Sequence, residues 1–438
     1  VIMIQGTMSN VGKSALAAGL CRVLKQDGYK VAPFKSQNMA LNSFITKEGL
    51  EMGRAQVMQA EAAGIEPEAI MNPILLKPTN DTGSQVIING KPIGVMAARE
   101  YYRHKKEYIP AIMDAYHELE KKYEIIVLEG AGSPAEINLK KDDIVNMGMA
   151  KLADAPVLLV GDIDRGGVFA QIAGTVMLLE EDEKARIKGT IINKFRGDIR
   201  LFESGVKMLE DLCGVPVVGV VPYYKDIYIE EEDSVMLQTK NIRAGQGKVN
   251  VAVVLLRHLS NFTDFNVLER DPRVHLFYTN NTDELMKADI ILLPGSKSTL
   301  SDLYELRRNG VAQAIVRAHR EGATVMGICG GYQLMGREVC DPDHVEGEIE
   351  RLPGLGLLPV STRMQGEKVT RQVRFRFLED SAVCEGYEIH MGTTTPLADV
   401  PVSPLNHLAD GREDGYFVDR TCMGTYVHGI LDNPSVID

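Results

Sequence analysis

Several features that would point to other protein classes are missing from this 438-residue sequence. None of its six cysteines forms a CxxC pair, and a chain of this length does not need disulfide bonds in order to fold. We therefore expect a reducing cytoplasm rather than a disulfide framework. No apolar run reaches the ~18 residues that a membrane span needs. A strand predicted directly from Val1 also leaves no signal peptide, and we therefore expect a cytoplasmic protein without a membrane partner.

Basic patches are missing as well. The net charge is -12 and no run of lysine or arginine stands out, so nucleic-acid binding, which needs a basic face, is not expected. Hydrophobic residues make up 45% and charged residues 25%, as in ordinary globular proteins. The length exceeds what one hydrophobic core usually serves, which predicts two or three domains.

The first half alternates short apolar runs with helical stretches. The apolar runs are nearly continuous, which is typical of parallel strands covered on both faces. Between the first two runs, Leu16, Leu20, Val23 and Leu24 recur at helical spacing. This strand–helix–strand pattern repeats and predicts a doubly wound α/β domain. The expected strands are residues 1–5, 30–34, 124–129, 156–162, 189–193 and 216–221.

The pattern breaks around residues 230–248, where four acidic residues are followed by Gly-Gln-Gly. We interpret this stretch as a linker between a first domain at 1–240 and a second at 249–438, with a solvated loop inside one domain as the alternative. A second α/β series follows, and residues beyond Gly354 favour antiparallel strands. The parallel strands expected there are residues 249–256, 274–278, 289–293 and 324–328.

A glycine-rich loop from Gly6 to Ser14 follows the first expected strand and opens the first helix, as a P-loop requires. Its N–H groups and the helix start can hold the phosphates of ATP, and Gly12 lets the backbone approach them. Lys13 is expected on the terminal phosphates and Ser14 on Mg²⁺. The alternative is a glycine-rich turn with a solvated lysine. Five residues separate Gly6 from Gly12, one more than usual, and this longer loop resembles that of dethiobiotin synthetase-like enzymes, which phosphorylate a carboxylate.

Polar residues close three later strands of the first half. Glu129 is placed to hold Mg²⁺ opposite the P-loop hydroxyl, because ligands bind at the carboxyl edge of parallel strands; a helix cap or loop carboxylate is the alternative. Asp162 and Asp164 could bind metal, position a substrate or cap a helix, and the sequence leaves these open. Asn193 is a candidate for reading the nucleotide base.

Cys329 lies between an expected strand and a helix, with Gly327, Gly330 and a further glycine around it, in the form of a nucleophile elbow. The helix start favours the thiolate, and the N–H of Gly330 can donate to an oxyanion. Gly295, in a turn that ends another strand, is the candidate for the second oxyanion donor. A buried structural cysteine is the alternative, but it would not need these glycines.

The thiolate also needs an acid and base partner. The sequence has nine histidines, of which His428 and His390 follow β-like runs late in the chain. Spacing alone does not choose between them.

Five longer strings are highly characteristic: FKSQNMALNS at 34–43, MNPILLKP at 71–78, DIDRGGVF at 162–169, NKFRGD at 193–198 and LSNFTDF at 259–265. With the loop and the elbow, they resemble the cobyric acid synthase family over nearly the whole chain. That resemblance implies a P-loop dethiobiotin synthetase-like domain followed by a class I glutamine amidotransferase-like (flavodoxin-like) α/β domain.

The resemblance implies the reaction as well. The family amidates the b, d, e and g carboxylates of adenosylcobyrinic acid a,c-diamide to give adenosylcobyric acid, using ATP, Mg²⁺ and glutamine. Cys329 would attack the glutamine amide, and His428 would serve as its base and acid. The usual class I pattern has a glutamate two residues after the histidine, where this chain has Ile430. The third member is thus missing at that position, and we expect another group to orient His428.

Two other functions compete with this interpretation. The related a,c-diamide synthase amidates different carboxylates, and residues 38–39 and 261–265 favour cobyric acid synthase over it. A P-loop partitioning or assembly ATPase would carry an additional lysine early in the loop, where this chain has Thr7, Met8 and Ser9. The cysteine elbow would also serve no purpose in such an ATPase.

Overall fold

The structure is a computed structural model that describes residues 1–79, 83–224, 241–401 and 403–437. Its internal contacts divide the chain into two compact units, and two short segments of the first half belong to the second unit. Most of the linker expected at 230–248 lies outside the described residues. The first unit comprises Val1–Met39, Met52–Leu76 and Gln85–Glu230, and the second comprises Ala40–Glu51, Lys77–Ser84 and Glu231–Asp438.

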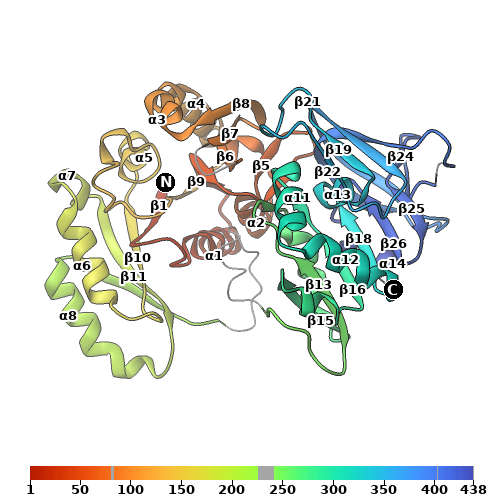
Figure 1. The fold of residues 1–438 in the computed structure, drawn as a ribbon. Coiled ribbons are helices and arrows are strands. Elements are labelled where there is room, and N and C mark those ends of the chain that lie inside the picture. The colour runs from red at the N-terminus through yellow and green to blue at the C-terminus, as the bar shows by residue number, and fades with distance from the viewer. Residues whose placement is uncertain (80–82, 225–240, 402, 438) are drawn as a thin grey trace. The chain divides into compact units, whose positions relative to one another are not determined.

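A six-stranded parallel sheet in the order β12-β11-β10-β1-β9-β2 forms the centre of the first unit (Figure 1). Each strand coincides with one of the six expected runs, so the prediction of a parallel sheet is confirmed. Because β1 lies between β9 and β10, the loops that follow these three strands share one edge of the sheet. The strands are β1 (Ile2–Gly6), β2 (Val31–Phe34), β9 (Ile125–Glu129), β10 (Val157–Asp162), β11 (Ile187–Phe195) and β12 (Val217–Pro222).

Helices surround this sheet, and α1 starts at the phosphate loop. Gly12 precedes it in the left-handed region (φ 96°), and α1 buries Ala17 and Cys21 against Ile4 and Val160 of the sheet. The helices are α1 (Lys13–Gln26), α2 (Arg54–Ala63), α3 (Ala98–His104), α4 (Ile109–Glu120), α5 (Met147–Leu152), α6 (Val168–Leu178), α7 (Glu181–Lys184) and α8 (Glu203–Cys213).

Sequence patterns did not assign two small sheets in the stretch between residues 37 and 97. Strands β3, β4 and β5 have only three residues each, and β8 is exposed over nearly its whole length, so none of these four shows the alternation of a half-buried strand. One sheet has the order β3-β6-β7-β8, and the other pairs β4 with β5. The strands are β3 (Gln37–Met39), β4 (Ser43–Ile45), β5 (Glu51–Gly53), β6 (Ile74–Pro78), β7 (Gly83–Ile88) and β8 (Lys91–Ala97).

The second unit contains another six-stranded sheet, in the order β15-β13-β16-β18-β26-β25. All neighbours are parallel except β25, which runs antiparallel to β26. The four parallel strands expected from the sequence are all present. The strands are β13 (Val249–Val254), β15 (Val274–Thr279), β16 (Ile290–Leu293), β18 (Thr324–Ile328), β25 (Tyr416–Asp419) and β26 (Cys422–Thr425).

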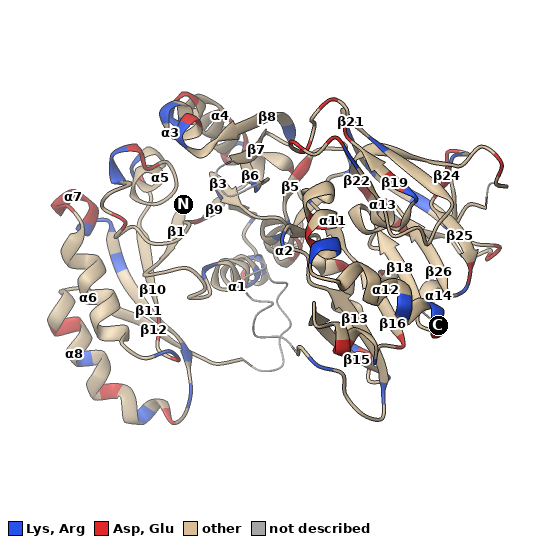
Figure 2. Cartoon of the chain, in the orientation of Figure 1, with Lys and Arg blue, Asp and Glu red and all other residues tan. Residues whose placement is uncertain are grey.

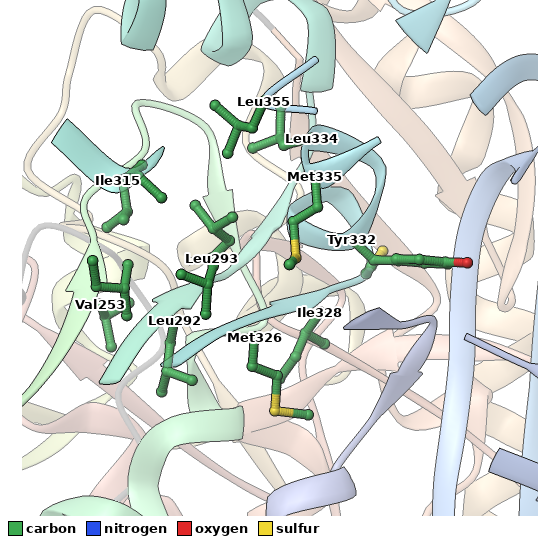
Figure 3. Close-up of a cluster of buried hydrophobic side chains, with 14 of the residues drawn as sticks. Val253, Leu292, Leu293, Ile315, Met326, Ile328, Tyr332, Leu334, Met335 and Leu355 are labelled. Carbon is green, nitrogen blue, oxygen red and sulfur yellow. The ribbon is translucent and has the colours of Figure 1, made fainter. Parts of the chain in front are cut away.

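The core of the second unit packs helices against this sheet. Figure 3 shows Val253, Leu293 and Ile328 from the strands close to Ile315 and Met335 from helices α12 and α13. All five side chains are fully buried. The helices of this unit are α9 (Asn266–Arg270), α10 (Thr282–Leu285), α11 (Thr299–Arg308), α12 (Val311–Arg320), α13 (Gly330–Met335) and α14 (Pro434–Ile437).

A largely antiparallel sheet adjoins this core and confirms the strands expected beyond Gly354. Its main path is β20-β19-β21-β22-β27, and it pairs Tyr387 of β22 with His428 of β27. A separate short ladder joins β14 (Leu259–Ser260) to β17 (Gly295–Ser296). The sheet's strands are β19 (Glu338–Cys340), β20 (Arg351–Pro353), β21 (Val360–Phe377), β22 (Cys384–Pro396), β23 (Asn406–Leu408), β24 (Glu413–Asp414) and β27 (Val427–His428).

Charges of both signs are interspersed along the helices, as on α8 in Figure 2. Within the described ranges, we find no helix with the length and apolar character needed to cross a membrane.

Candidate functional site

The turn at Cys329 has the geometry of a nucleophile elbow. Cys329 joins β18 to α13 with φ 53° and ψ −110°, a left-handed backbone that is strained for a residue with a side chain. A Cβ on Gly331 would lie 1.9 Å from the carbonyl oxygen of Leu293, and one on Gly327 would lie 2.6 Å from Gly331. The glycines are therefore required by close packing, and they hold the thiol at the start of a helix.

His428 connects this thiol to a buried carboxylate. Its Nδ1 lies 2.7 Å from Oδ2 of Asp264, and the N–H of Gly429 donates to the other oxygen of Asp264 at 2.9 Å. On the opposite side of the ring, Nε2 lies 3.4 Å from Nδ2 of Asn261, and the Cys329 thiol is within hydrogen-bonding reach of the imidazole. Cys329, His428 and Asp264 are thus arranged as a nucleophile, an imidazole and an orienting acid.

Electrostatics favour a charged imidazole in this arrangement. Burial by itself would lower the pKa of His428, but the adjacent charges of Asp264 and the Cys329 thiolate raise it to about 10. His428 is then an imidazolium at neutral pH. A cysteine beside such a cation reacts as a thiolate.

Asp264 is the functional residue that sequence reasoning missed. It lies 164 positions before His428, in the turn Phe262–Phe265, and no spacing rule connects the two. Ile430, two residues after His428, is fully buried in the hydrophobic core, and its side chain has no acceptor for the imidazole. The available signal was the acidic residue within the string at 259–265. The expectation that another group orients His428 therefore has a structural answer.

A segment from the first half of the chain holds the Asp264 turn. Oδ1 of Asn42 accepts the N–H of Phe262 at 3.1 Å, and the N–H of Ser43 donates to Oδ1 of Asn261 at 3.1 Å. Tyr387, which stacks on the His428 ring with 5.3 Å between centroids, donates to the carbonyl of Ser43. Asn42 and Ser43 thus hold the Asp264 turn through the backbone of Phe262 and the side chain of Asn261.

The rival histidine, His390, lines the same cavity as Cys329 but has other contacts. Its ring stacks on Tyr426 with 3.8 Å between centroids, and its Nδ1 lies 3.2 Å from the carbonyl oxygen of Gly392. Its Nε2 lies 3.8 Å from Glu388, not from Asp264. His428 alone of the two is positioned between an acid and the thiol.

The turn at Gly295 lies against the elbow. The N–H of Lys297 bonds back to His258, and because amides alternate along an antiparallel strand, the N–H of Ser296 points away from that ladder. The Ser296 nitrogen lies 2.6 Å from where a Cβ on Gly330 would stand. A Cβ on Gly295 would instead lie 3.3 Å from the His428 ring. Of the two residues, Ser296 therefore aims its amide at the elbow, whereas Gly295 leaves room for the histidine.

In the first unit, the predicted metal residues meet each other. Oγ of Ser14 donates to Oε1 of Glu129 at 2.7 Å, Lys35 reaches the same oxygen at 3.1 Å, and Gln59 donates to Oε2 at 2.5 Å. Burial would raise the pKa of Glu129, but the Lys35 charge and the hydrogen bonds of Ser14 and Gln59 hold it below its usual value. Glu129 is therefore ionised at neutral pH. One hydroxyl and one carboxylate fit Mg²⁺, which takes few protein ligands and completes its shell with phosphates and water.

Hydrogen bonds from Lys13 and Asn193 hold the phosphate loop in place. Lys13 donates to the carbonyls of Met8 at 3.0 Å and Gly132 at 3.1 Å. Asn193 donates to the carbonyl of Val11 at 2.7 Å, so its amide nitrogen supports the loop. A Cβ on Gly6 would lie 2.5 Å from Val11, and one on Gly12 would lie 2.3 Å from Asn193.

Asp162 at the end of β10 and Asp164 in the turn after it, whose roles the sequence left undecided, are both ion-paired. Asp162 is buried and lies 2.8 Å from Lys194, whereas Asp164 is partly exposed and pairs with Arg196.

Comparisons with known proteins match both units. Residues 2–235 match the family described as the CobQ/CobB/MinD/ParA nucleotide binding domain, and residues 250–436 match the CobB/CobQ-like glutamine amidotransferase domain. A cobyric acid synthase of Bacteroides fragilis is 80% identical over 100% of this chain and 89% of its own. Those of Phocaeicola vulgatus and Parabacteroides distasonis are 67% and 58% identical over 100% of this chain and 88% and 89% of theirs.

The chain belongs to the cobyric acid synthase family. The predicted fold class, a P-loop domain followed by a glutamine amidotransferase-like α/β domain, is confirmed. Membership in the cobyric acid synthase family agrees with the sequence strings that separated it from the a,c-diamide synthase. A partitioning ATPase would have no use for the matched amidotransferase domain.

The Asp264 contact leads to a test by Asp264→Asn. Without the carboxylate charge, burial lowers the pKa of His428, so the imidazolium and its thiolate partner are lost at neutral pH. We expect glutamine hydrolysis to fall by about 10²- to 10⁴-fold, as when a triad histidine loses its acid. Steady-state hydrolysis at pH 7 measures this, with a thermal melt to check folding.

His390→Gln provides the comparison for this test, since His390 lines the cavity but has no contact with Asp264. We expect it to reduce hydrolysis less than Asp264→Asn does. If His390→Gln were inactive and Asp264→Asn active, the assignment of His428 would have to be withdrawn.

Proposed function

We propose that this chain amidates the b, d, e and g carboxylates of adenosylcobyrinic acid a,c-diamide, using ATP, Mg²⁺ and ammonia taken from glutamine. The observation that carries the proposal is the arrangement of Cys329, His428 and Asp264 in a chain that also has a P-loop domain. The corrinoid, glutamine and ATP follow from the family to which the chain belongs. All six cysteines are free, which supports a reducing, cytoplasmic location.

The second unit would release ammonia from glutamine. The Cys329 thiolate attacks the amide carbon, and the His428 imidazolium protonates the departing nitrogen, leaving a thioester, neutral histidine and ammonia. Water then attacks the thioester while His428 takes one of its protons and the second passes to solvent, which returns glutamate, the thiolate and the imidazolium. Asp264 keeps the ring oriented and stabilises its charge in both steps.

Two backbone N–H groups are the candidates for stabilising the oxyanion of this reaction. Gly330 opens helix α13 directly after the thiol, and the amide of Ser296 faces it across the turn. We assign the second donor to Ser296 and keep Gly295 as the small residue beside His428. Oγ of Ser296 donates to Asp302 at 2.6 Å, which holds the turn in place.

The first unit would activate the carboxylate. Gly6, Gly12 and Lys13 would hold the ATP phosphates, with Asn193 beside them, and Ser14 and Glu129 would bind Mg²⁺, which supplies charge neutralisation when bound. The substrate carboxylate attacks the γ-phosphorus and ADP leaves, which gives an acyl phosphate. Ammonia then displaces phosphate to form the amide. Supplying unprotonated ammonia from the same chain raises its effective concentration.

Cys329→Ala separates the two half-reactions. We expect glutamine-driven amidation to be lost and amidation driven by added ammonium salt to continue, because activation of the carboxylate does not use the thiol. The assay measures amidated corrinoid with each nitrogen source. Glutamine hydrolysis at the parent rate in this variant would show that Cys329 is not the nucleophile.

Lys13→Ala tests the other unit. Amidation should fall by at least about 100-fold with glutamine and with ammonium alike, because both need the phosphorylated carboxylate. Lys207→Ala, at a solvent-facing position of α8, is the matched control and should leave both rates unchanged. Normal ammonium-driven amidation in Lys13→Ala would contradict the P-loop assignment.

A further inference from the structure

A cluster of buried and half-buried lysines lies beside the thiol and is not used by the mechanism above. The cavity next to Cys329 has a volume of about 40 Å³, and its wall includes Lys77, Lys297, Lys368 and Glu346. All of these residues belong to the second unit. The reacting groups of the glutaminase therefore share a cavity wall with several formal charges.

Two of the lysines are tied together by one carboxylate. Glu51 lies 2.9 Å from Nζ of Lys77 through Oε1 and 2.5 Å from Nζ of Lys368 through Oε2. Oγ of Ser43 accepts another hydrogen bond from Lys77 at 2.9 Å. The side chains of Glu51, Lys77 and Lys368 are all at least nine-tenths buried.

The charges of this cluster suit a small zwitterion. Glu51 lies between the amino groups of Lys77 and Lys368, whose charges hold its pKa well below its usual value although burial opposes this. Burial in turn lowers the pKa of Lys368, against the charge of Glu51. Burial lowers the pKa of Lys297 to about 7 and raises that of Glu346 to about 7. Because both pKa values lie close to neutral pH, a ligand of opposite charge in the cavity would favour the charged forms of Lys297 and Glu346.

Stabilisation of the fold alone does not explain why these charged residues are buried here. A buried ion cluster usually stabilises a fold no better than well-packed apolar side chains do, because desolvation offsets the attraction. Its position is more informative: Lys368 pairs across the sheet with Met391, two residues from Ile389, whose carbonyl oxygen lies 3.4 Å from Sγ of Cys329. The ammonium groups therefore lie on the cavity that the nucleophile itself lines.

We propose that Lys77 and Lys368, held together by Glu51, bind the α-carboxylate of glutamine, and that Glu346 faces its α-ammonium group. The assignment rests on the proposed glutaminase function. Three saturated carbons separate the carboxylate of glutamine from its amide, so the head group and the reacting carbon occupy one cavity. The cavity volume admits only a few water molecules, so the cavity must widen around this cluster to admit glutamine.

Lys77 and Glu51 come from the first half of the sequence, outside the matched amidotransferase region at 250–436. The proposed glutamine site is therefore completed by Ser43, Glu51 and Lys77 from the first half of the chain. The string at 71–78 contains Lys77, and the string at 34–43 ends on Ser43, which holds it.

Two thiol reagents test this proposal on the full chain. Azaserine carries the α-amino acid head of glutamine, whereas iodoacetamide alkylates the same thiolate without it. In Lys77→Met we expect inactivation by azaserine to slow by about 10- to 100-fold, since a charge-assisted hydrogen bond is lost. Inactivation by iodoacetamide should keep its rate, and the KM for glutamine should rise by a similar factor with kcat little changed.

Lys47→Met is the matched control, because Lys47 lies in the same inserted segment but is exposed. It should leave both inactivation rates as they are. The proposal is overturned if Lys77→Met slows both reagents equally, or slows neither. The underlying proposal, that Cys329 is the nucleophile of a glutaminase, is tested separately. It would be overturned if Cys329→Ser still hydrolysed glutamine.

Discussion

The hydrogen bond between Nδ1 of His428 and Asp264 is the contact on which the glutaminase geometry depends. At 2.7 Å it joins two side chains that are both nearly inaccessible to water, so the carboxylate charge acts on the imidazole with little screening. It fixes the ring, leaves Nε2 for the thiol side and raises the pKa of His428 despite burial. A cysteine at a strained elbow would otherwise face a neutral, unrestrained imidazole.

That contact in turn relies on residues from the first half of the chain. Asn42 and Ser43 satisfy the backbone and side chain of the turn that presents Asp264, and Phe44 packs on the same Tyr387 that stacks against His428. Lys77, which lines the cavity beside Cys329, and its partner Glu51 also come from the first half of the chain. The second unit is therefore not a contiguous stretch of sequence, although its family match is.

Sequence patterns predicted the elements whose burial is periodic or continuous. The ten expected parallel strands are all present, because strands covered on both faces need unbroken apolar runs such as residues 125–128 of β9. Gly327, Cys329 and Gly331 were recognisable because a tight strand–helix turn requires glycines at fixed offsets. Ser14 and Glu129 lie within hydrogen-bonding distance because each is close to the carboxyl end of a parallel strand, and their role as Mg²⁺ ligands stays a prediction.

The remaining features depend on contacts between residues far apart in sequence. Asp264 meets His428 across 164 positions, and Lys368 meets Glu51 across 317, and no local period records either pairing. The turn at Gly295 is another example. The glycine was visible in the sequence, but the direction of the neighbouring Ser296 amide follows from the β14–β17 register, which the sequence does not record. Among the strands between residues 37 and 97, β3 to β5 have three residues each and β8 is exposed along nearly all of its length, so none of these shows an alternating pattern.

The central claim is that Asp264 keeps His428 charged beside the thiol. The most direct measurement is a nuclear magnetic resonance titration of the full chain with labelled histidine, in which His428→Gln identifies the resonance. We predict that His428 remains an imidazolium throughout the neutral range and loses its proton only near pH 10. Because the folded-state pKa is raised, the stabilisation from this pair should be present at neutral pH and be lost as the pH rises through that value. A His428 resonance that titrates near 6.5, the ordinary value for histidine, would contradict the account.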